Sequence, residues 1–522
     1  MARATAHAFD SPQRYLFSGG AGRAPNGANG VKGGNGGNGV LNLKRPCQCG
    51  SVACGLIYQR VMADMSRRKF LGGAAAMMLP FTGARAASNW LRHPTPSDRP
   101  LLLTNLRLFD GSGKPVQNGV QVLIQGNVIA ALPSAGQSVD GAQVIDCQGK
   151  LVMPGLIDVH WHSMLAAVGQ TVAMTADLGY LYIAAAEEAE RTLMRGFTSI
   201  RDAGGPAFAL KRAIDEGMVP GPRIYPSGAM ISQTSGHGDF RLRSDLPRAA
   251  NTPLSFVESA GVAMIADGTA EVLRRVREQL MLGASQIKVM AGGGVSSLYD
   301  PLDSTQFSEV ELQAAVDAAA DWNTYVMAHV YTPKGIQRTI KAGVKCIEHG
   351  QLADEESVRM MREEGVWWSL QPFLMDEDAN TYPDAARQES QRRVSEGTVR
   401  AYELAQKYGI KTGWGTDILF NAKNTPSQGR QLAKLVRFYD PLTLLAQATG
   451  VNGDLLALSG QRNPYPKPLG RIAPGALADI LVADGDPSRN LDFLGDPETH
   501  LRLIMKDGKV YKNTLSAAPA GQ

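Results

Sequence analysis

The sequence predicts an α/β protein, a (β/α)8 TIM barrel with a small β-sandwich domain built from both ends of the mature chain. Two observations predict the barrel. Short apolar runs recur along the middle of the chain, and amphipathic stretches such as 271–282 and 308–322 separate them. Eight such runs are found, and eight parallel strands are the number that closes a barrel. The runs are 156–162, 197–203, 223–228, 286–291, 325–330, 346–350, 366–371 and 409–417.

Short β-type runs at both ends of the chain predict the second domain. Between 101 and 152 they are interrupted by Gly111, Gly126 and Gly149, at positions where hairpins need glycine. The same pattern of short β-type runs is found again in ADILVADG (478–485) and LRLIMKDGKVYKN (501–513). We therefore expect 87–152 and 462–515 to form one β-sandwich domain, and 153–461 to form the barrel domain.

The charge of the chain is concentrated near its start. The whole sequence has 53 Lys and Arg against 49 Asp and Glu, for a net charge of +4. Residues 1–86 hold eleven of the basic residues and only two of the acids, so the remainder is mildly acidic. This balance, with no sustained basic tract, gives no support to nucleic-acid binding. A content of 44% hydrophobic residues excludes a disordered or collagen-like chain.

Residues 1–64 are expected to be a disordered or non-native upstream extension. The Gly/Asn tract at 19–39 has almost nothing apolar to bury and cannot offset its own ordering entropy. Cys47, Cys49 and Cys54 lie close enough to bind zinc, but no fourth ligand stands at finger spacing. The two remaining cysteines, Cys147 and Cys346, are expected to be small buried hydrophobic residues.

Residues 65–86 resemble a twin-arginine signal peptide. The motif SRRKFL (66–71) leads into a short apolar run that ends at Phe81, and the small-x-small site Ala84–Ala86 follows. The run is too short to span a bilayer, so no stable membrane insertion is expected. The alternative is a chance Arg-Arg pair before an apolar helix. We expect translation to start at Met62 or Met65 rather than Met1. The twin-arginine export machinery would then deliver a periplasmic or secreted protein cleaved near Ala86.

Histidines and an aspartate stand at the ends of four predicted strands. His160 and His162 are two residues apart on the first strand, so both side chains face the same way. His329 ends the fifth strand, His349 the sixth and Asp417 the eighth. Because the carboxyl ends of barrel strands meet at one face, these side chains are expected to converge. Neutral imidazoles with a carboxylate are typical ligands of Zn²⁺.

These segments resemble the metal-dependent amidohydrolase superfamily. The motifs are PGLIDVHWH (154–162), QIKVMAGGGVSS (286–297) and GWGTD (413–417), and the resemblance covers essentially the whole mature chain. It implies two divalent metal ions, expected to be Zn²⁺, bridged by N6-carboxylated Lys288. The alternative for Lys288 is an ordinary lysine whose amine reaches water. By the same resemblance one ion is held by His160, His162 and Asp417, and the other by His329 and His349.

The resemblance also implies a mechanism. A water shared by two Zn²⁺ ions is hydroxide near neutral pH, and this metal-bridging hydroxide attacks the amide carbonyl. Asp417 takes the proton from the bridging water and delivers it to the leaving amine.

Three further motifs resemble the branch of Xaa-Pro dipeptidases and carboxypeptidases, which also includes ochratoxin-hydrolysing amidohydrolases. They are GFTSIRDAGG (196–205), ISQTSGHGD (231–239) and AHVYT (328–332). The expected substrate is the amide bond of an N-acyl amino acid or dipeptide, with ochratoxin A, which yields ochratoxin alpha and phenylalanine, among the candidates. This resemblance implies that His237 and Tyr331 donate hydrogen bonds to the carbonyl oxygen of the substrate. The alternatives are loop ordering for His237 and packing for Tyr331.

For two other groups of residues the sequence allows two roles each. Arg201 and Asp202, after the second strand, either position substrate or brace the site. Trp367, Trp368 and Phe373 lie at and beyond the seventh strand. At least one is expected in the core, and one facing the barrel mouth would contact an apolar side chain or an aromatic acyl group.

Other functions remain as alternatives. A deaminase of the same superfamily has a glutamate shortly after the fifth-strand histidine, where this chain has Val330 to Pro333 and no acid. A lactonase, cyclic-amide hydrolase or phosphotriesterase would share every metal ligand. A non-catalytic metal-binding scaffold is disfavoured because all six ligand positions are occupied. The partners expected are a small-molecule amide or dipeptide and, by resemblance, further copies of the chain in a homo-oligomer.

Overall fold

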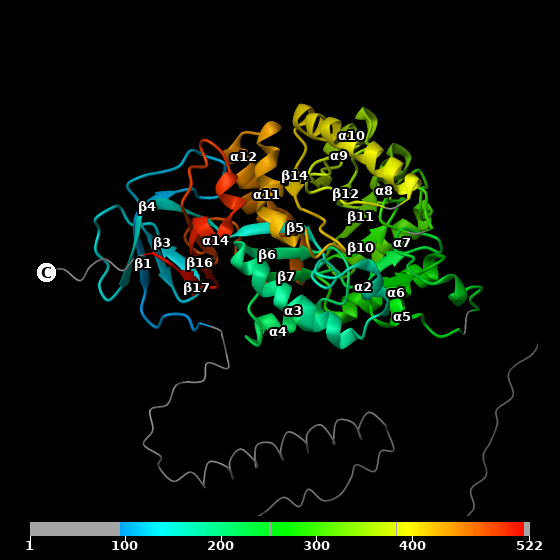
Figure 1. Ribbon diagram of the computed structural model, residues 1–522, viewed down its shortest axis with the longest axis horizontal. Coiled ribbons are helices and arrows are strands. Elements are labelled where there is room, and N and C mark those ends of the chain that lie inside the picture. Colours follow the sequence, from blue (N-terminus) through cyan, green and yellow to red (C-terminus); the bar gives the residue numbers. More distant parts are fainter. Residues whose placement is uncertain (1–93, 250–251, 298, 383, 516–522) are drawn as a thin grey trace, which may run out of the picture. The chain divides into compact units, whose positions relative to one another are not determined.

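The computed structural model describes residues 94–249, 252–297, 299–382 and 384–515 (Figure 1). The predicted extension, signal peptide and three-cysteine segment lie outside the described residues, as do residues 87–93 of the predicted sandwich. No helix of the described chain is both long and apolar enough to cross a membrane.

Each of the eight predicted runs contains one strand of a parallel barrel, surrounded by helices (Figure 1). The strands form two sheets, and two backbone hydrogen bonds join their edges. Ser285 N donates to Pro226 O at 2.8 Å, and Asp417 N donates to His160 O at 2.8 Å. The barrel strands are β5 (Leu156–Trp161), β6 (Phe197–Asp202), β7 (Arg223–Pro226), β10 (Ile287–Met290), β11 (Val326–Val330), β12 (Cys346–His349), β13 (Trp367–Leu370) and β14 (Thr412–Trp414).

Two short strands were not predicted. β8 (Met230–Ser232) pairs in parallel with both β10 and β9 (Ala263–Ile265), so it extends the larger barrel sheet. Three residues are too few to show a strand period in the sequence.

The main barrel helices begin and end at recognisable capping residues. In α7 (Glu309–Ala320), Ser308 and Glu311 form a capping box, with Ser308 Oγ donating to Glu311 Oε2 at 2.7 Å. Helix α6 (Thr269–Leu282) ends at Gly283 with φ of 101°, a left-handed conformation that favours glycine. The predicted helical stretches 271–282 and 308–322 thus coincide with α6 and α7. The other long helices are α3 (Leu178–Met194), α4 (Phe208–Asp215), α8 (Pro333–Lys341), α9 (Glu355–Glu363) and α10 (Ala385–Tyr408).

The two ends of the described chain meet in one seven-stranded mixed sheet, in agreement with the domain predicted from both ends. β15 pairs antiparallel with β4, and Val482 lies opposite Val152. The sheet order is β17-β16-β15-β4-β1-β2-β3. Its strands are β1 (Leu101–Leu108), β2 (Val122–Gln125), β3 (Val128–Ala131), β4 (Gln143–Pro154), β15 (Ile480–Ala483), β16 (Leu501–Lys506) and β17 (Lys509–Asn513).

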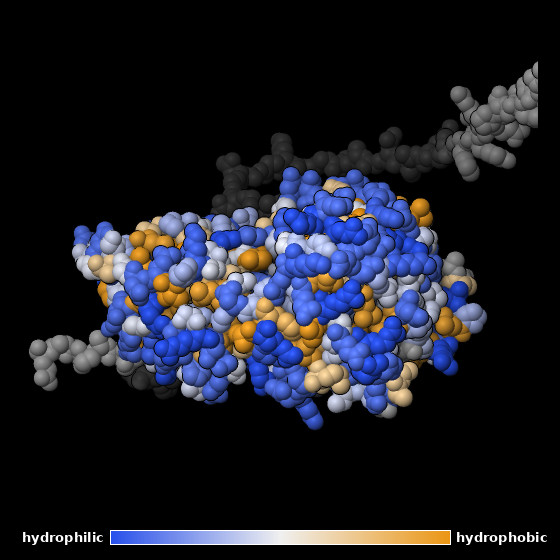
Figure 2. Space-filling view, turned by 90° about the horizontal axis from the view of Figure 1, so that it is seen from above, coloured by the Kyte–Doolittle hydropathy of each residue, from blue (hydrophilic) through white to orange (hydrophobic). Residues whose placement is uncertain are grey.

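β4 continues almost directly into the first barrel strand, β5. Gly155 lies between them, and a Cβ at that position would come within 2.1 Å of Thr198 Oγ1. The close approach of β5 to β6 therefore requires glycine here. The outer surface seen in Figure 2 is mostly hydrophilic, with hydrophobic residues scattered among the polar ones.

Candidate metal centre

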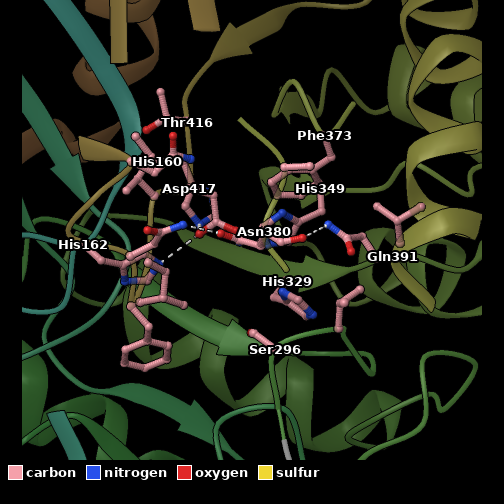
Figure 3. A pocket seen from close by; sticks show the side chains of 18 of the residues that line it. His160, His162, Ser296, His329, His349, Phe373, Asn380, Gln391, Thr416 and Asp417 are labelled. Carbon is pink, nitrogen blue, oxygen red and sulfur yellow. Dashed lines mark hydrogen bonds and ion pairs between the residues drawn. The ribbon is translucent and has the colours of Figure 1, made fainter. Parts of the chain in front are cut away.

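The carboxyl ends of the barrel strands surround a cavity of about 490 Å³. Figure 3 shows side chains from several strands pointing into it. All eight residues assigned to the site in the sequence line this cavity: His160, His162, His237, Lys288, His329, Tyr331, His349 and Asp417. The structure therefore brings together residues that are far apart in the sequence.

Asp417 contacts both His160, in β5, and His162, one residue after β5 ends. Its Oδ1 is 3.2 Å from the Nε2 of His160 and 3.2 Å from the Nε2 of His162 (Figure 3). Both imidazoles are buried, and the aspartate side chain is 17% exposed. Burial acts to raise the pKa of Asp417, but the neighbouring imidazoles outweigh it and hold that pKa well below its usual value. The carboxylate is thus ionised, as a metal ligand or general base must be.

Lys288 extends from β10 into the same space. Its Nζ is 3.4 Å from His160 Nε2, and the residue is only 1% exposed. The amine therefore does not reach bulk water, as the alternative role for this lysine required. Burial lowers its pKa although the charges of Glu348 and Asp417 oppose that effect. A lowered pKa favours the uncharged amine, which is the form that reacts with CO₂ to give a carbamate and a proton.

His329 and His349 form the opposite side of the cluster. Their ring centroids are 4.5 Å apart. Burial is the main cause that places the pKa of each ring well below its usual value, so both imidazoles are neutral, the form that binds metals. His349 Nδ1 is buried and has no hydrogen-bond partner within the described chain.

These donor atoms fit a site for divalent cations. One ligand atom each from His160, His349 and Asp417 lie within 4.8 Å of one another. A bound cation would provide partners for buried ring nitrogens that would otherwise cost desolvation energy. Four imidazoles, a carboxylate and a lysine that can become anionic form the nitrogen and oxygen donor set that Zn²⁺ accepts.

Two buried charged residues, Glu348 and Arg201, hold the Nδ1 side of the His160 ring. Its Nδ1 lies 2.6 Å from Glu348 Oε2, and Glu348 Oε1 accepts a hydrogen bond from Arg201 Nη2 at 2.6 Å. Burial acts to raise the pKa of Glu348, but Arg201 outweighs it and holds that pKa far below its usual value. Such a carboxylate orients the ring and leaves Nε2 free for a metal. Arg201 therefore braces the site instead of contacting substrate.

The second residue left open, Asp202, also braces the site. Its Oδ2 accepts a hydrogen bond from Ser163 N at 2.8 Å, and its Oδ1 accepts one from Gly204 N at 3.1 Å. His162 Nδ1 lies 3.0 Å from Gly204 O, so the same turn orients the second histidine of the pair.

Three supporting acids were not predicted from the sequence: Glu348, Asp158 and Asp300. Asp158 Oδ2 accepts hydrogen bonds from Thr416 Oγ1 at 2.8 Å and from Gln428 Nε2 at 3.0 Å, which ties β5 to the segment carrying Asp417. A signal was available for Asp158 and Glu348, because an acid inside an otherwise apolar strand is rarely buried without a partner. Cys346 is buried as expected, but its Sγ lies 3.0 Å from Glu348 Oε1, in this polar network.

His237 and Tyr331 flank His329 and His349. The ring of His237 stacks on His329, with centroids 3.9 Å apart and an interplanar angle of 11°. Its Nδ1 is 2.9 Å from Ser297 Oγ and 3.2 Å from Asp300 Oδ2. Tyr331 stacks on His349 with centroids 5.2 Å apart. Both residues line the cavity, where a substrate carbonyl could reach them.

The remaining wall of the cavity is largely aromatic and aliphatic. Phe373 lines it and stacks on His349 with centroids 5.8 Å apart, whereas Trp367 and Trp368 are buried away from it. Phe240 and Phe420 meet edge to face at 6.0 Å on another part of the wall. Of the three aromatic residues considered for the mouth, Phe373 is the one placed to contact substrate.

Comparison with known proteins agrees with this geometry. Residues 151–513 match the Amidohydrolase family. Ochratoxinase from Aspergillus niger is 31% identical over 425 residues, which cover 78% of this chain and 85% of that protein.

Three solved structures are also similar. A prolidase complexed with N-methylphosphonate-L-proline is 34% identical with a TM-score of 0.72, covering 79% of this chain and 100% of that one. The structure of A. niger ochratoxinase is 28% identical with a TM-score of 0.69, covering 80% and 96%. A Xaa-Pro dipeptidase with bound methionine is 28% identical with a TM-score of 0.68, covering 79% and 100%. The chain therefore belongs to the amidohydrolase family and is a hydrolase that acts on amide bonds.

Proposed function

We propose that the protein hydrolyses the amide bond of N-acyl amino acids or dipeptides. The observation that carries this proposal is one cavity that joins an ionised Asp417, shared by two imidazoles, to a wall containing Phe240, Phe373 and Phe420. The polar end supplies groups for hydrolysis, and the apolar wall suits an aromatic acyl group or side chain.

Two divalent cations, which we take to be Zn²⁺, belong to this proposal. One would be held by His160, His162 and Asp417, the other by His329 and His349, and N6-carboxylated Lys288 would lie between them. When bound, the cations supply Lewis acidity and lower the pKa of a water from about 15.7 to about 7. The buried, neutral imidazoles and the lowered pKa of Lys288 support this arrangement.

The residues of the chain perform the remaining steps. Asp417 accepts the proton of the attacking water as the C–O bond forms. It then transfers this proton to the nitrogen of the leaving amine, after which the C–N bond breaks. His237 and Tyr331 donate hydrogen bonds to the carbonyl oxygen as its negative charge develops. Ser297 and Asp300 hold His237 near Nδ1. In the tautomer in which Nδ1 accepts the hydrogen bond of the Ser297 hydroxyl, Nε2 carries the ring hydrogen and can donate to the substrate carbonyl.

The relatives suggest which amides to test. They are named as an ochratoxinase, a prolidase and a Xaa-Pro dipeptidase, and we extend these activities to this chain as candidates. Ochratoxin A, an aromatic acyl group joined to phenylalanine by an amide bond, fits the aromatic wall of the cavity.

A substrate screen tests the proposal. Zinc-loaded protein is incubated with N-acyl amino acids, Xaa-Pro and other Xaa-Xaa dipeptides, and ochratoxin A, and the released amino acid is quantified. We expect release from at least one of these classes, and loss of that activity in Asp417→Asn. Lactones and cyclic amides are included in the same screen. Hydrolysis of these compounds, with no amino acid released from any of the amide substrates, would overturn the proposal and favour the alternative activity.

We further propose that the protein is exported by the twin-arginine pathway. The support is the sequence SRRKFL at 66–71 with the apolar run and Ala84–Ala86 behind it. N-terminal sequencing of protein recovered from the periplasm or medium should find a start near Ala87. Recovery of a chain that starts at Ala2 would contradict this.

A further inference from the structure

A run of three glycines at 292–294 follows the strand that carries Lys288, and the proposed chemistry gives it no role. The run belongs to the motif QIKVMAGGGVSS (286–297) and comes one residue after β10 ends. None of the three glycines lies in the left-handed region of φ, so a positive φ does not explain them. The reason for glycine at these positions must therefore lie in the atoms that surround them.

Two of these glycines would collide with their surroundings if they carried a side chain. A Cβ at Gly293 would lie 1.9 Å from the backbone O of Pro301, so this glycine is needed for the packing of the segment itself. A Cβ at Gly294 would lie 2.0 Å from Cε1 and 2.3 Å from Nδ1 of His237. The missing side chain of Gly294 thus makes room for a ring of the cavity wall.

The ring of His237 is held by several contacts and cannot easily give way to such a side chain. It stacks on His329 with centroids 3.9 Å apart, and its Nδ1 lies 2.9 Å from Ser297 Oγ. The backbone N of His237 donates to Gln306 Oε1 at 2.8 Å, and both residues are buried. The histidine is therefore held at one face of the ring, at one ring nitrogen and at the backbone.

The backbone of Gly294 belongs to the same set of contacts. Its N donates to Asp300 Oδ2 at 3.0 Å, and that oxygen lies 3.2 Å from Nδ1 of His237. Gln306 Nε2 donates to the same oxygen at 3.2 Å. Alanine at position 294 would keep this N–H group. The change that it brings is a methyl group beside the imidazole, so the substitution separates crowding of the ring from loss of a hydrogen bond.

We propose that Gly294 is a positioning residue for His237, because its missing side chain admits the ring to the place from which it donates to the substrate carbonyl. This inference rests on the proposed function, which makes His237 a hydrogen-bond donor. Carbon atoms in contact lie about 3.5 Å apart, so a methyl group at position 294 would displace the ring by about 1.5 Å. Hydrogen bonds from nitrogen to oxygen span about 2.7 to 3.2 Å, so a ring displaced this far loses its contact with the carbonyl oxygen.

A double-mutant cycle between positions 294 and 237 tests this inference. The zinc-loaded native protein is compared with Gly294→Ala, His237→Ala and the double variant, and kcat and KM are measured on the best amide substrate of the screen. Thermal unfolding of the same four proteins reports on packing without any substrate. The control is Gly169→Ala. Gly169 is exposed and has a φ of −73°, and no atom of the described chain lies within 4 Å of a Cβ placed there.

We expect Gly294→Ala to lower kcat by about 100-fold and to change KM less, since the ring acts on charge that develops during the reaction. It should also lower the midpoint of thermal unfolding. In the His237→Ala background the methyl group meets no ring, so Gly294→Ala should change kcat and the midpoint little. Gly293→Ala, which meets the backbone of Pro301, should lower the midpoint in both backgrounds. Native kcat in Gly294→Ala, or an equal loss in both backgrounds, would overturn the inference.

The unfolding measurements keep this test apart from that of the proposed function. If the native protein releases no amino acid from any amide, the proposed function fails. In that case a lower unfolding midpoint for Gly294→Ala that disappears in the His237→Ala background still supports the placing of His237 by Gly294. An unchanged midpoint for Gly294→Ala overturns it.

Discussion

The Nδ1 of His160 lies 2.6 Å from Oε2 of Glu348, and both side chains are almost fully buried. Because Glu348 is also paired with Arg201, it stays ionised and accepts a hydrogen bond from the Nδ1–H of the ring. His160 then presents Nε2 to Asp417 and Lys288. Glu348, which does not contact substrate, thus determines which nitrogen of His160 is available to bind a metal ion.

Glu348→Gln should weaken cation binding by about 10- to 100-fold, since a neutral amide is a poorer partner for the ligand ring. Competition with a chelator measures the affinity, and circular dichroism checks the fold. Glu356→Gln, on the exposed side of α9, is the matched control. Equal affinities for the two variants would contradict the role given to Glu348.

Asp417→Asn should lower kcat by about 10²- to 10⁴-fold, because an amide cannot accept the proton of the attacking water. The fold should be nearly unchanged, since the substitution keeps the size of the side chain. Steady-state kinetics on the best substrate of the screen and a thermal unfolding curve measure the two effects. Hydrolysis at the native rate would refute the assignment of Asp417.

Lys288→Ala should retain fewer than two cations per chain after dialysis, because the proposed bridging group is lost. Elemental analysis by mass spectrometry gives the stoichiometry. Lys334→Ala, at an exposed position in α8, should behave as the native protein. Full occupancy in Lys288→Ala would count against a carboxylated lysine.

His237→Ala should lower kcat by about 10²- to 10³-fold, the usual effect of removing one donor to a developing oxyanion. Cation content should be unchanged, which separates this role from metal binding. Tyr331→Phe tests the second donor with minimal loss of packing against His349. If His237 only orders its loop, kcat will remain near the native value once the protein is folded.

Lys506 should make stability depend on pH in the alkaline range. Burial lowers its pKa from 10.5 to about 8, and the nearby charge of Arg223 adds to this effect. Below pH 8 both the folded and the unfolded chain carry the proton, and the folded state bears the full cost of the buried charge. Between about pH 8 and 10.5 the unfolded chain binds more protons, so the free energy of unfolding rises with pH.

Lys506→Met removes this titration. Relative to the variant, the native protein should gain up to about 3 kcal/mol in unfolding free energy between pH 8 and 10.5. Urea unfolding at pH steps across this range measures the difference. Parallel pH profiles for the two proteins would show that Lys506 does not titrate in this way.

The proposed ligand positions could be predicted because their pattern is local. His160 and His162 share one side of a strand, and His329, His349 and Asp417 stand at the ends of three others. Strand ends of a parallel barrel meet at one face whatever the lengths of the connecting helices. The eight apolar runs therefore place these residues in one cavity before any contact is known. The two β-rich ends were predicted to meet for a related reason, since short strands need partners to bury their apolar faces.

Other parts of the site depend on contacts that no local pattern encodes. Glu348 meets His160 across 188 residues, and Asp158 meets Gln428 across 270. Which wall residue faces the cavity also follows from packing, as Phe373 lines it while Trp367 and Trp368 do not. β8 and β9 are too short to show a period.

The sequence by itself thus determined the barrel, the two-ended sheet domain and the polar residues at the strand ends. Strand period and the direction of parallel strands are properties of short segments, and they suffice for these features. Only the tertiary structure decided how Glu348 and Arg201 support His160, and how Asp300 holds His237. The physical reason is that a hydrogen bond or ion pair requires its two partners within about 3 to 4 Å, and only the folded chain brings such distant residues that close.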